Sequence, residues 1–256
     1  MQRQIALIGY GTIGKYLFQQ LRKQEDVQIT CVYEVNQETA KTVPEHLAVS
    51  TPAELEMLLG NGKIDLVVET ATSQAVQSLA PKILEHADMV VFSTTAFAKE
   101  DFESTILALC SKFSRKIYVP HGAILGLDGI RDGREMLESV TITTTKKPVN
   151  LGRTDTKRAV LYEGPTRGAC QLFPRNVNVH ASVAIAGLGF DKTISRIVAD
   201  PDSEGNVHNI EITAAGVKFR IEICSTPLGL VTGAYTPVSA FNSVNKIFAG
   251  NGYTII

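Results

Sequence analysis

The chain has 256 residues, of which 44% are hydrophobic and 20% are charged, and its formal net charge is −1. A chain of this length and composition can bury a large core and form two modest domains. A net charge so near zero lacks the basic excess that binding to nucleic acid or to an anionic membrane would need. We therefore expect neither as a partner.

The cysteines and the N-terminus bear on location. The chain has four cysteines, and no two of them form a C-x-x-C pair: Cys31, Cys110, Cys170 and Cys224. This spacing disfavours a zinc ribbon or a disulfide framework and favours a reducing compartment. The apolar run near the N-terminus is too short for a signal-peptide core, and no run approaches the ~20 residues that span a bilayer. We therefore expect a cytoplasmic protein.

The first half of the chain alternates strand-like and helix-like segments. Short apolar runs predict strands at residues 4–9, 27–34, 64–71, 88–94 and 116–120. Apolar residues at helical spacing predict helices after the first, third and fourth of these runs, and Ser73 is the expected cap of the second helix. This alternation indicates an α/β domain over residues 1–120, with a parallel sheet covered by helices on both faces.

The second half is richer in strands. We predict a connection at 121–130, helices between Thr166 and Gly187 with a break at Pro174, and strands at 139–145, 158–164, 195–201, 206–213 and 217–224. This order indicates an α+β domain over residues 121–237, built on a mostly antiparallel sheet. A weakly helical segment at about 238–250 is expected to pack back on the first domain.

A glycine-rich turn follows the first predicted strand. Gly9, Gly11 and Gly14 form G-x-G-x-x-G between an apolar strand and an amphipathic helix, where such glycines let a pyrophosphate approach the helix N-terminus. Glu34 ends the next strand, where its carboxylate can accept hydrogen bonds from the adenine ribose and repel a 2′-phosphate. The pattern predicts a dinucleotide site that prefers NAD, with NADP as the alternative. A glycine turn without a nucleotide is the plainer interpretation of the motif alone.

One histidine lies on an inward face. His208 opens the alternating segment 206–213 on the same face as Ile210 and Ile212. An imidazole there can be a general base, or a core histidine whose nitrogens are satisfied by the backbone. His121 and His180 lie on other elements, without metal-ligand spacing or a nearby carboxylate cluster, so no metal site is expected.

Several longer segments carry a family likeness. The most specific are NVHNIEI (206–212) and FPRNVNV (173–179). Others are IALIGYGTIGKYL (5–17), VVETATSQAV (67–76), FSTTAFAKEDF (92–102), GAILGLDGI (122–130) and AIAGLGFDKT (184–193). In these segments, which run through most of the chain, the sequence resembles the L-aspartate dehydrogenases, NAD(P)-dependent enzymes that oxidise aspartate to iminoaspartate.

The resemblance implies an N-terminal Rossmann domain with a doubly wound parallel sheet, and a C-terminal α+β domain whose sheet helps to form a homodimer. It also implies that His208 is the catalytic residue and that Ala123 and Asn178 contact the cofactor. Further cofactor contacts are expected in the glycine turn and at the carboxyl ends of the third and fourth strands, from Thr12, Ile13, Ala71, Ser93 and Thr94.

The implied activity is hydride transfer from the Cα of a small amino acid, with L-aspartate the leading substrate, to NAD. The imine product would hydrolyse to oxaloacetate and ammonia or feed NAD biosynthesis. A dicarboxylate substrate needs cationic partners. The candidates are Lys146, Lys147, Arg153, Arg167 and Arg175.

Three positions depart from the family pattern. His121 occupies a position where a small residue commonly precedes G-A-I, His180 occupies one where alanine commonly follows N-x-N-V, and GAYTP (233–237) replaces N-P-K-T-S. These departures leave two alternatives open. One is a related dehydrogenase or imine reductase with a different amine or carbonyl-acid substrate, and the other is a non-catalytic, NAD-binding redox sensor.

Overall fold

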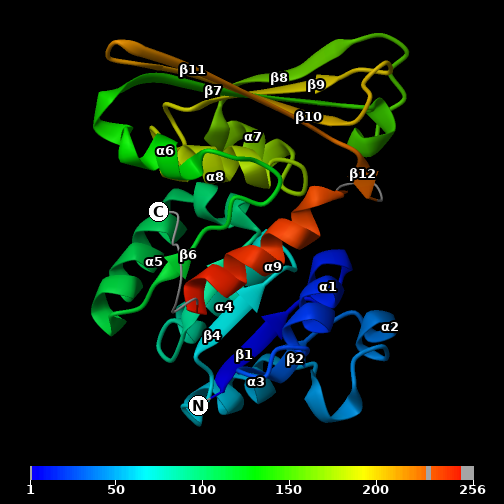
Figure 1. Ribbon diagram of the computed structural model, residues 1–256, viewed down its shortest axis with the longest axis vertical. Coiled ribbons are helices and arrows are strands. Elements are labelled where there is room, and N and C mark those ends of the chain that lie inside the picture. The colour runs from blue at the N-terminus through cyan, green and yellow to red at the C-terminus, as the bar shows by residue number, and fades with distance from the viewer. Residues whose placement is uncertain (1, 229–231, 249–256) are drawn as a thin grey trace. The chain divides into compact units, whose positions relative to one another are not determined.

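The computed structural model describes residues 2–228 and 232–248 (Figure 1). The chain divides into two compact units. The first contains the residues up to Pro120 together with Ala240–Ile247, and the second contains His121–Ser239. Across the described residues, no helix combines the length and the apolar character needed to cross a membrane.

The first unit is built on a parallel sheet of six strands in the order β3-β2-β1-β4-β5-β6. Its strands are β1 (Arg3–Ile8), β2 (Val27–Tyr33), β3 (Ala48–Val49), β4 (Leu66–Glu69), β5 (Asp88–Val91) and β6 (Ile117–Tyr118). The strand order reverses between β1 and β4. This is the doubly wound arrangement that was predicted, and such a reversal opens a ligand-binding crevice at the carboxyl ends of the strands.

Helices alternate with these strands: α1 (Thr12–Leu21), α2 (Gln37–Ala40), α3 (Pro52–Gly60), α4 (Ser73–Ile83) and α5 (Glu100–Phe113), with short 3₁₀ turns η1 (Glu45–Leu47) and η2 (Thr94–Ala98). Helices α3, α4 and α5 lie side by side, with α4 in contact with both neighbours. Because such crossovers are right-handed as a rule and the strand order reverses, α1 is expected on the opposite face of the sheet. The prediction that Ser73 caps α4 is wrong. The cap is Thr72, whose side chain accepts a hydrogen bond from the backbone N–H of Ala75.

The second unit contains a five-stranded sheet in the order β11-β10-β7-β9-β8. Its strands are β7 (Leu137–Lys146), β8 (Ala159–Pro165), β9 (Ile194–Ala199), β10 (Asn206–Ala214) and β11 (Val217–Ser225). Only β7 and β9 pair in parallel; the other three pairs are antiparallel. The sheet is therefore mixed and mostly antiparallel, as predicted.

Three helices lie against one face of this sheet (Figure 1): α6 (Leu127–Asp132), α7 (Thr166–Leu172) and α8 (Asn178–Ala186). Apolar residues of α6 and α8, and Ile124 before α6, meet the inward residues of β7 and β10. This core contains Ile124, Ile130, Val140, Ile142, Val183, Ala186, Ile210 and Ile212. The break at Pro174 separates α7 from α8 as predicted. The prediction of a plain connection at 121–130 missed the start of α6, which follows Gly126 in the left-handed conformation.

The remaining elements are the short turns η3 (Arg134–Met136) and η4 (Pro148–Leu151), the two-residue strands β12 (Pro227–Leu228) and β13 (Thr232–Gly233), and the helix α9 (Tyr235–Phe248). Helix α9 starts earlier than the weak pattern predicted, and it contributes Ala240–Ile247 to the first unit. Residues 249 and 250 of the predicted segment lie outside the described residues.

Candidate functional site

The glycine turn of the first unit links β1 to α1. Gly9 adopts a left-handed φ of +89°, and a Cβ on it would lie 2.9 Å from Ala71, which follows β4. A Cβ on Gly14 would overlap the carbonyl oxygen of Gly9. At Gly11, by contrast, a Cβ would meet nothing within 4 Å. Two of the glycines thus allow close packing, and the third leaves space beside the start of α1.

The start of α1 has the chemistry of an anion site. Gly11 is its N-cap and offers no side chain to the N–H groups of the first turn, which contains Thr12, Ile13 and Gly14 and no acidic residue. Unpaired N–H groups and the positive end of the helix dipole favour an anion at such a position. This part of the structure fits the pyrophosphate of a dinucleotide.

Glu34 is fixed beside this turn. Its Oε2 accepts a hydrogen bond from the backbone N–H of Tyr10 at 2.8 Å, and its Oε1 accepts one from that of Asn36, also at 2.8 Å. The carboxylate therefore lies next to the glycine turn, at the position where a ribose-binding acid is required, and each oxygen keeps a further lone pair for a ligand hydroxyl.

A second carboxylate, which the sequence analysis missed, joins the loops after β4 and β5. Glu69 is fully buried, and its Oε1 accepts hydrogen bonds from the N–H of Ala71 at 2.7 Å and the hydroxyl of Ser93 at 2.8 Å. Its Oε2 accepts one from the N–H of Ser93 at 3.0 Å. Burial raises the pKa of Glu69 to about 7. Glu69 thereby fixes Ala71 and Ser93 at the carboxyl edge, and Thr94, also buried, begins η2 directly after them.

In the second unit, His208 lies on β10 with its side chain buried, as predicted. It is opposite Thr144 of β7 in the antiparallel ladder. The Thr144 hydroxyl lies 2.8 Å from His208 Nδ1 and 2.6 Å from Nε2 of His180, which comes from α8. The exposed fractions of His208, Thr144 and His180 are 4%, 1% and 0%. The structure thus joins two histidines that the sequence analysis treated separately, through a threonine that it did not single out.

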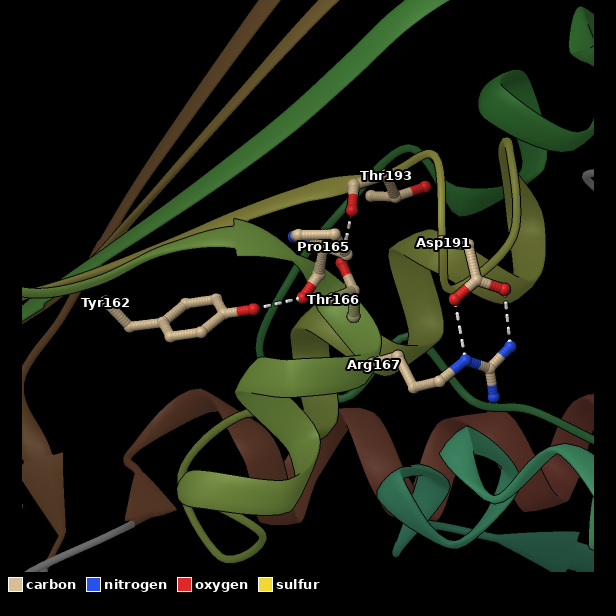
Figure 2. Close-up of polar contacts among 6 residues, drawn as sticks. All are labelled: Tyr162, Pro165, Thr166, Arg167, Asp191 and Thr193. Carbon is tan, nitrogen blue, oxygen red and sulfur yellow. Dashed lines mark hydrogen bonds and ion pairs between the residues drawn. The ribbon is translucent and has the colours of Figure 1, made fainter.

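The polar contacts continue beyond His180. Its Nδ1 lies 2.9 Å from the Ser195 hydroxyl on β9, which lies 2.8 Å from the Thr166 hydroxyl at the start of α7. Thr166 donates in turn to the backbone carbonyl of Thr193 at 3.0 Å (Figure 2). Ser195 and Thr166 are fully buried. We call the four side chains of Thr144, His180, Ser195 and Thr166 the buried polar chain.

Lys146 lies two residues after Thr144 on the inward face of β7 and is 3% exposed. Its Nζ donates to Oδ1 of Asn176 at 3.3 Å, and burial lowers its pKa to about 8. Burial and the neighbouring Lys146 charge lower the pKa of His208 to about 3. Burial first, and then the charges of His208 and Lys146, hold the pKa of His180 well below its usual range. Both imidazoles are therefore neutral at pH 7.

The other predicted cations have different environments. Arg153 forms a two-point ion pair with Asp155, with distances of 2.6 Å and 2.9 Å. Arg167 pairs in the same manner with Asp191, at 2.7 Å for both contacts (Figure 2). The side chains of Lys147 and Arg175 are exposed. Of the five candidates, Lys146 alone lies buried beside the two histidines.

The last two predicted cofactor contacts, Ala123 and Asn178, belong to the second unit, whereas the other nine lie in the first. Ala123 follows Gly122, whose φ is +59°. Asn178 is the first residue of α8 and shares its opening turn with His180. His121 donates from Nδ1 to the carbonyl of Ile124 at 2.8 Å. Within the part of the chain that the structure describes, no three His, Cys, Asp or Glu side chains are grouped to hold a metal ion.

Comparisons with known proteins cover both units. The family model described as "Aspartate dehydrogenase, C-terminal" matches residues 128–247, and that described as "Homoserine dehydrogenase, NAD binding domain" matches residues 9–120. The L-aspartate dehydrogenase of Methanococcoides burtonii is 34% identical over 95% of this chain and 96% of its own. That of Archaeoglobus fulgidus is 36% identical over 88% of each chain. The crystal structure of aspartate dehydrogenase from Thermotoga maritima superposes with a TM-score of 0.77 at 27% identity, covering 97% of this chain and 96% of that one.

Proposed function

The chain belongs to the L-aspartate dehydrogenase family, and from that premise we propose that it oxidises L-aspartate to iminoaspartate with NAD as the hydride acceptor. The observation that carries the proposal is the setting of His208: a buried, neutral imidazole held by a hydroxyl, with the buried cation Lys146 close by. A neutral base and a cation are the two groups that oxidation of an amino dicarboxylate requires.

The cofactor would be held in the first unit by the glycine turn. The N–H groups of the first turn of α1 would bind the pyrophosphate, and Glu34 would bind the adenine ribose and disfavour the 2′-phosphate of NADP. Ala71, Ser93 and Thr94 would line the carboxyl edge of the sheet, while Ala123 and the amide of Asn178 would orient the nicotinamide. When bound, NAD supplies the acceptor for the hydride.

His208 would act as the general base. Its imidazole takes one proton from the substrate ammonium, which frees the nitrogen lone pair. That pair forms the C=N bond as the Cα–H electron pair departs with the hydrogen as hydride, and His208 keeps the proton until the product leaves. In the free protein the Lys146 charge helps to hold His208 neutral. Substrate carboxylates beside Lys146 would offset that charge and so raise the basicity of His208 when it is needed.

Lys146 would bind a substrate carboxylate. It is a buried ammonium that donates to a neutral amide oxygen and, among the described residues, forms no ion pair, so most of the cost of desolvating its charge is not offset in the free protein. A carboxylate would supply the missing counter-charge. Arg153 and Arg167 already have carboxylate partners, which supports Lys146 over these two.

The same family membership supports three further proposals: a cytoplasmic location, a homodimer in which the sheet of the second unit takes part, and hydrolysis of the imine or its use in NAD biosynthesis. The comparisons favour neither of the two alternatives, a related enzyme with another substrate or an NAD-binding sensor.

The proposal is tested by turnover. We expect L-aspartate, among a panel of amino acids, to reduce NAD faster than NADP, as followed by the absorbance of the reduced cofactor. Replacing His208→Ala should lower kcat/KM by roughly 10²- to 10⁴-fold, because a positioned base contributes that much. His86→Ala, an exposed histidine, is the matched control and should leave turnover unchanged. Tight NAD binding without turnover of any amino acid would contradict the proposal in favour of the sensor.

A further inference from the structure

We propose that the buried polar chain fixes the tautomer of His208, so that Nδ1 carries the proton and the Nε2 lone pair is left as the proton acceptor, with His180 as a positioning residue. The inference rests on the proposed role of His208 as the base. A neutral imidazole can carry its single proton on either nitrogen, and only the unprotonated nitrogen can accept a substrate proton.

The donor and acceptor of each hydrogen bond in the buried polar chain are determined starting from Thr166, the member furthest from His208. The carbonyl oxygen of Thr193 can only accept, and the Thr166 hydroxyl, which has one proton, lies 3.0 Å from it (Figure 2). If that proton pointed elsewhere, two oxygen lone pairs would face each other at hydrogen-bonding distance. Thr166 therefore donates to Thr193, and the contact of 2.8 Å between Thr166 and Ser195 must have Ser195 as its donor.

Each following contact is then determined. The one proton of Ser195 is used, so Ser195 accepts from Nδ1–H of His180 at 2.9 Å. A neutral His180 carries no second proton, so its Nε2 accepts from the Thr144 hydroxyl at 2.6 Å. Because Thr144 donates its one hydroxyl proton to His180, it can only accept from His208, so His208 donates to it from Nδ1–H at 2.8 Å. His208 Nε2 is left without a proton.

This ordering depends on two conditions that the structure meets. First, the buried polar chain must be shielded from water. Each of its four side chains is 1% exposed or less, so bulk water does not compete for their hydrogen bonds. His180 must be neutral, and the groups that face it favour this. Burial is the largest cause that disfavours a charge on His180, and a positive charge on either neighbour, His208 of β10 or Lys146 of β7, disfavours it further.

The tautomers can be read directly from the imidazole ¹⁵N and ¹H correlations of the full chain labelled with ¹⁵N-histidine at pH 7, without substrate. Signals are assigned by their loss in His208→Gln and His180→Gln. We expect both His208 and His180 to carry the proton on Nδ1. A His208 protonated on Nε2 would overturn the inference. This readout is independent of turnover, so it stands or falls separately from the proposed function.

A second test removes the link itself. Thr144→Val deletes the hydroxyl but keeps the β-branched shape, and we expect kcat with L-aspartate to fall roughly 10²-fold while KM changes less than about twofold. The His208 signals should then show a mixture of tautomers. Thr144→Ser keeps a hydroxyl and should restore kcat. Thr143→Val, the same change on the opposite face of β7, is the matched control and should leave kcat unchanged.

The outcomes separate a positioning role from a structural one. A folded Thr144→Val protein whose kcat and His208 tautomer both match the unmodified chain would overturn the inference. So would a Thr144→Ser protein as impaired as Thr144→Val, because the hydroxyl would then not be the determining group.

Discussion

Lys146 carries an ammonium group in a setting that penalises its charge. Burial lowers its pKa to about 8, and its Nζ donates to the neutral amide oxygen of Asn176. Its neighbour Lys147, which follows the end of β7, is exposed. The two lysines are adjacent in sequence, yet only one is placed where a substrate carboxylate would gain a strong, desolvated partner.

The Lys146→Gln replacement should raise KM for L-aspartate by roughly 10- to 100-fold, because a hydrogen bond to a charged group contributes about 1.5–3 kcal/mol. In the unmodified protein KM should also rise above pH 8, as Lys146 loses its proton, and Lys146→Gln should abolish that rise. Initial-rate kinetics from pH 7 to 9.5 measure both effects, with Lys147→Gln as control. Equal KM values for the Lys146 and Lys147 variants would assign the carboxylate to another group.

At the scale of elements, the glycine turn, the alternation of strands and helices along the first unit and the inward face of β10 were predictable, because each depends on local periodicity or on a short motif. The partners of His208 were not. Thr144 lies in the run TITTT, where four of the five residues are threonines, and only the register with β10 singles out the one opposite His208. The contact of His180 with Thr144 depends on how α8 packs on the sheet, which no local pattern encodes.

Glu69 illustrates the same limit. It ends a buried apolar strand, as Glu34 follows another, and the two carboxylates look alike in sequence. Glu34 was identified by its distance from the glycine motif, whereas the role of Glu69 depends on the loop after β5, which supplies Ser93. A carboxylate closing a buried strand, followed by a small residue, is the signal that could have indicated it.

The glycine turn gives a prediction that separates folding from binding. Gly14→Ala should destabilise the protein by about 1–3 kcal/mol, because its methyl group would overlap the carbonyl of Gly9. Gly11→Ala has free space and an ordinary φ of −75°, so the free energy of unfolding should stay within about 0.5 kcal/mol. Its methyl group would nevertheless occupy the space beside the N-terminus of α1, and the Kd for NAD should rise at least about tenfold.

Urea unfolding and calorimetric titration with NAD measure the two quantities. Equal NAD affinity in Gly11→Ala and the unmodified chain would show that the pyrophosphate does not approach this glycine.

Over the whole molecule, the buried titratable groups should make stability depend on pH. The pKa of His208 falls to about 3 on folding and that of His180 is also lowered, so below pH 6.5 the unfolded chain binds more protons than the folded one. Each histidine should therefore reduce the free energy of unfolding by up to about 1.4 kcal/mol per pH unit as the pH drops below 6.5. Glu69 has the opposite effect. Its pKa rises to about 7 on folding, so it lowers the free energy of unfolding as the pH increases from about 4.5 to 7.

Urea unfolding at pH 5, 6 and 7 measures this slope. Two histidines outweigh one carboxylate, so stability should rise from pH 5 to 6.5. His180→Gln should reduce the slope of stability against pH by the contribution of about one proton, whereas His46→Gln, at an exposed position, should leave the slope unchanged. A slope in His180→Gln equal to that of the unmodified chain would mean that His180 is already solvated.

The buried polar chain ends on a peptide carbonyl, and this has a consequence for catalysis. Proton hopping along hydroxyls and imidazoles requires a final group that can hold the arriving proton or release it to water. The carbonyl of Thr193, which also accepts from the N–H of Thr166 at 2.9 Å, can do neither. The buried polar chain therefore cannot transfer a proton away from His208 past Thr166. In the proposed mechanism, a proton taken up by His208 must therefore leave from the side of the imidazole on which it arrived, so regeneration of the base would have to await departure of the product.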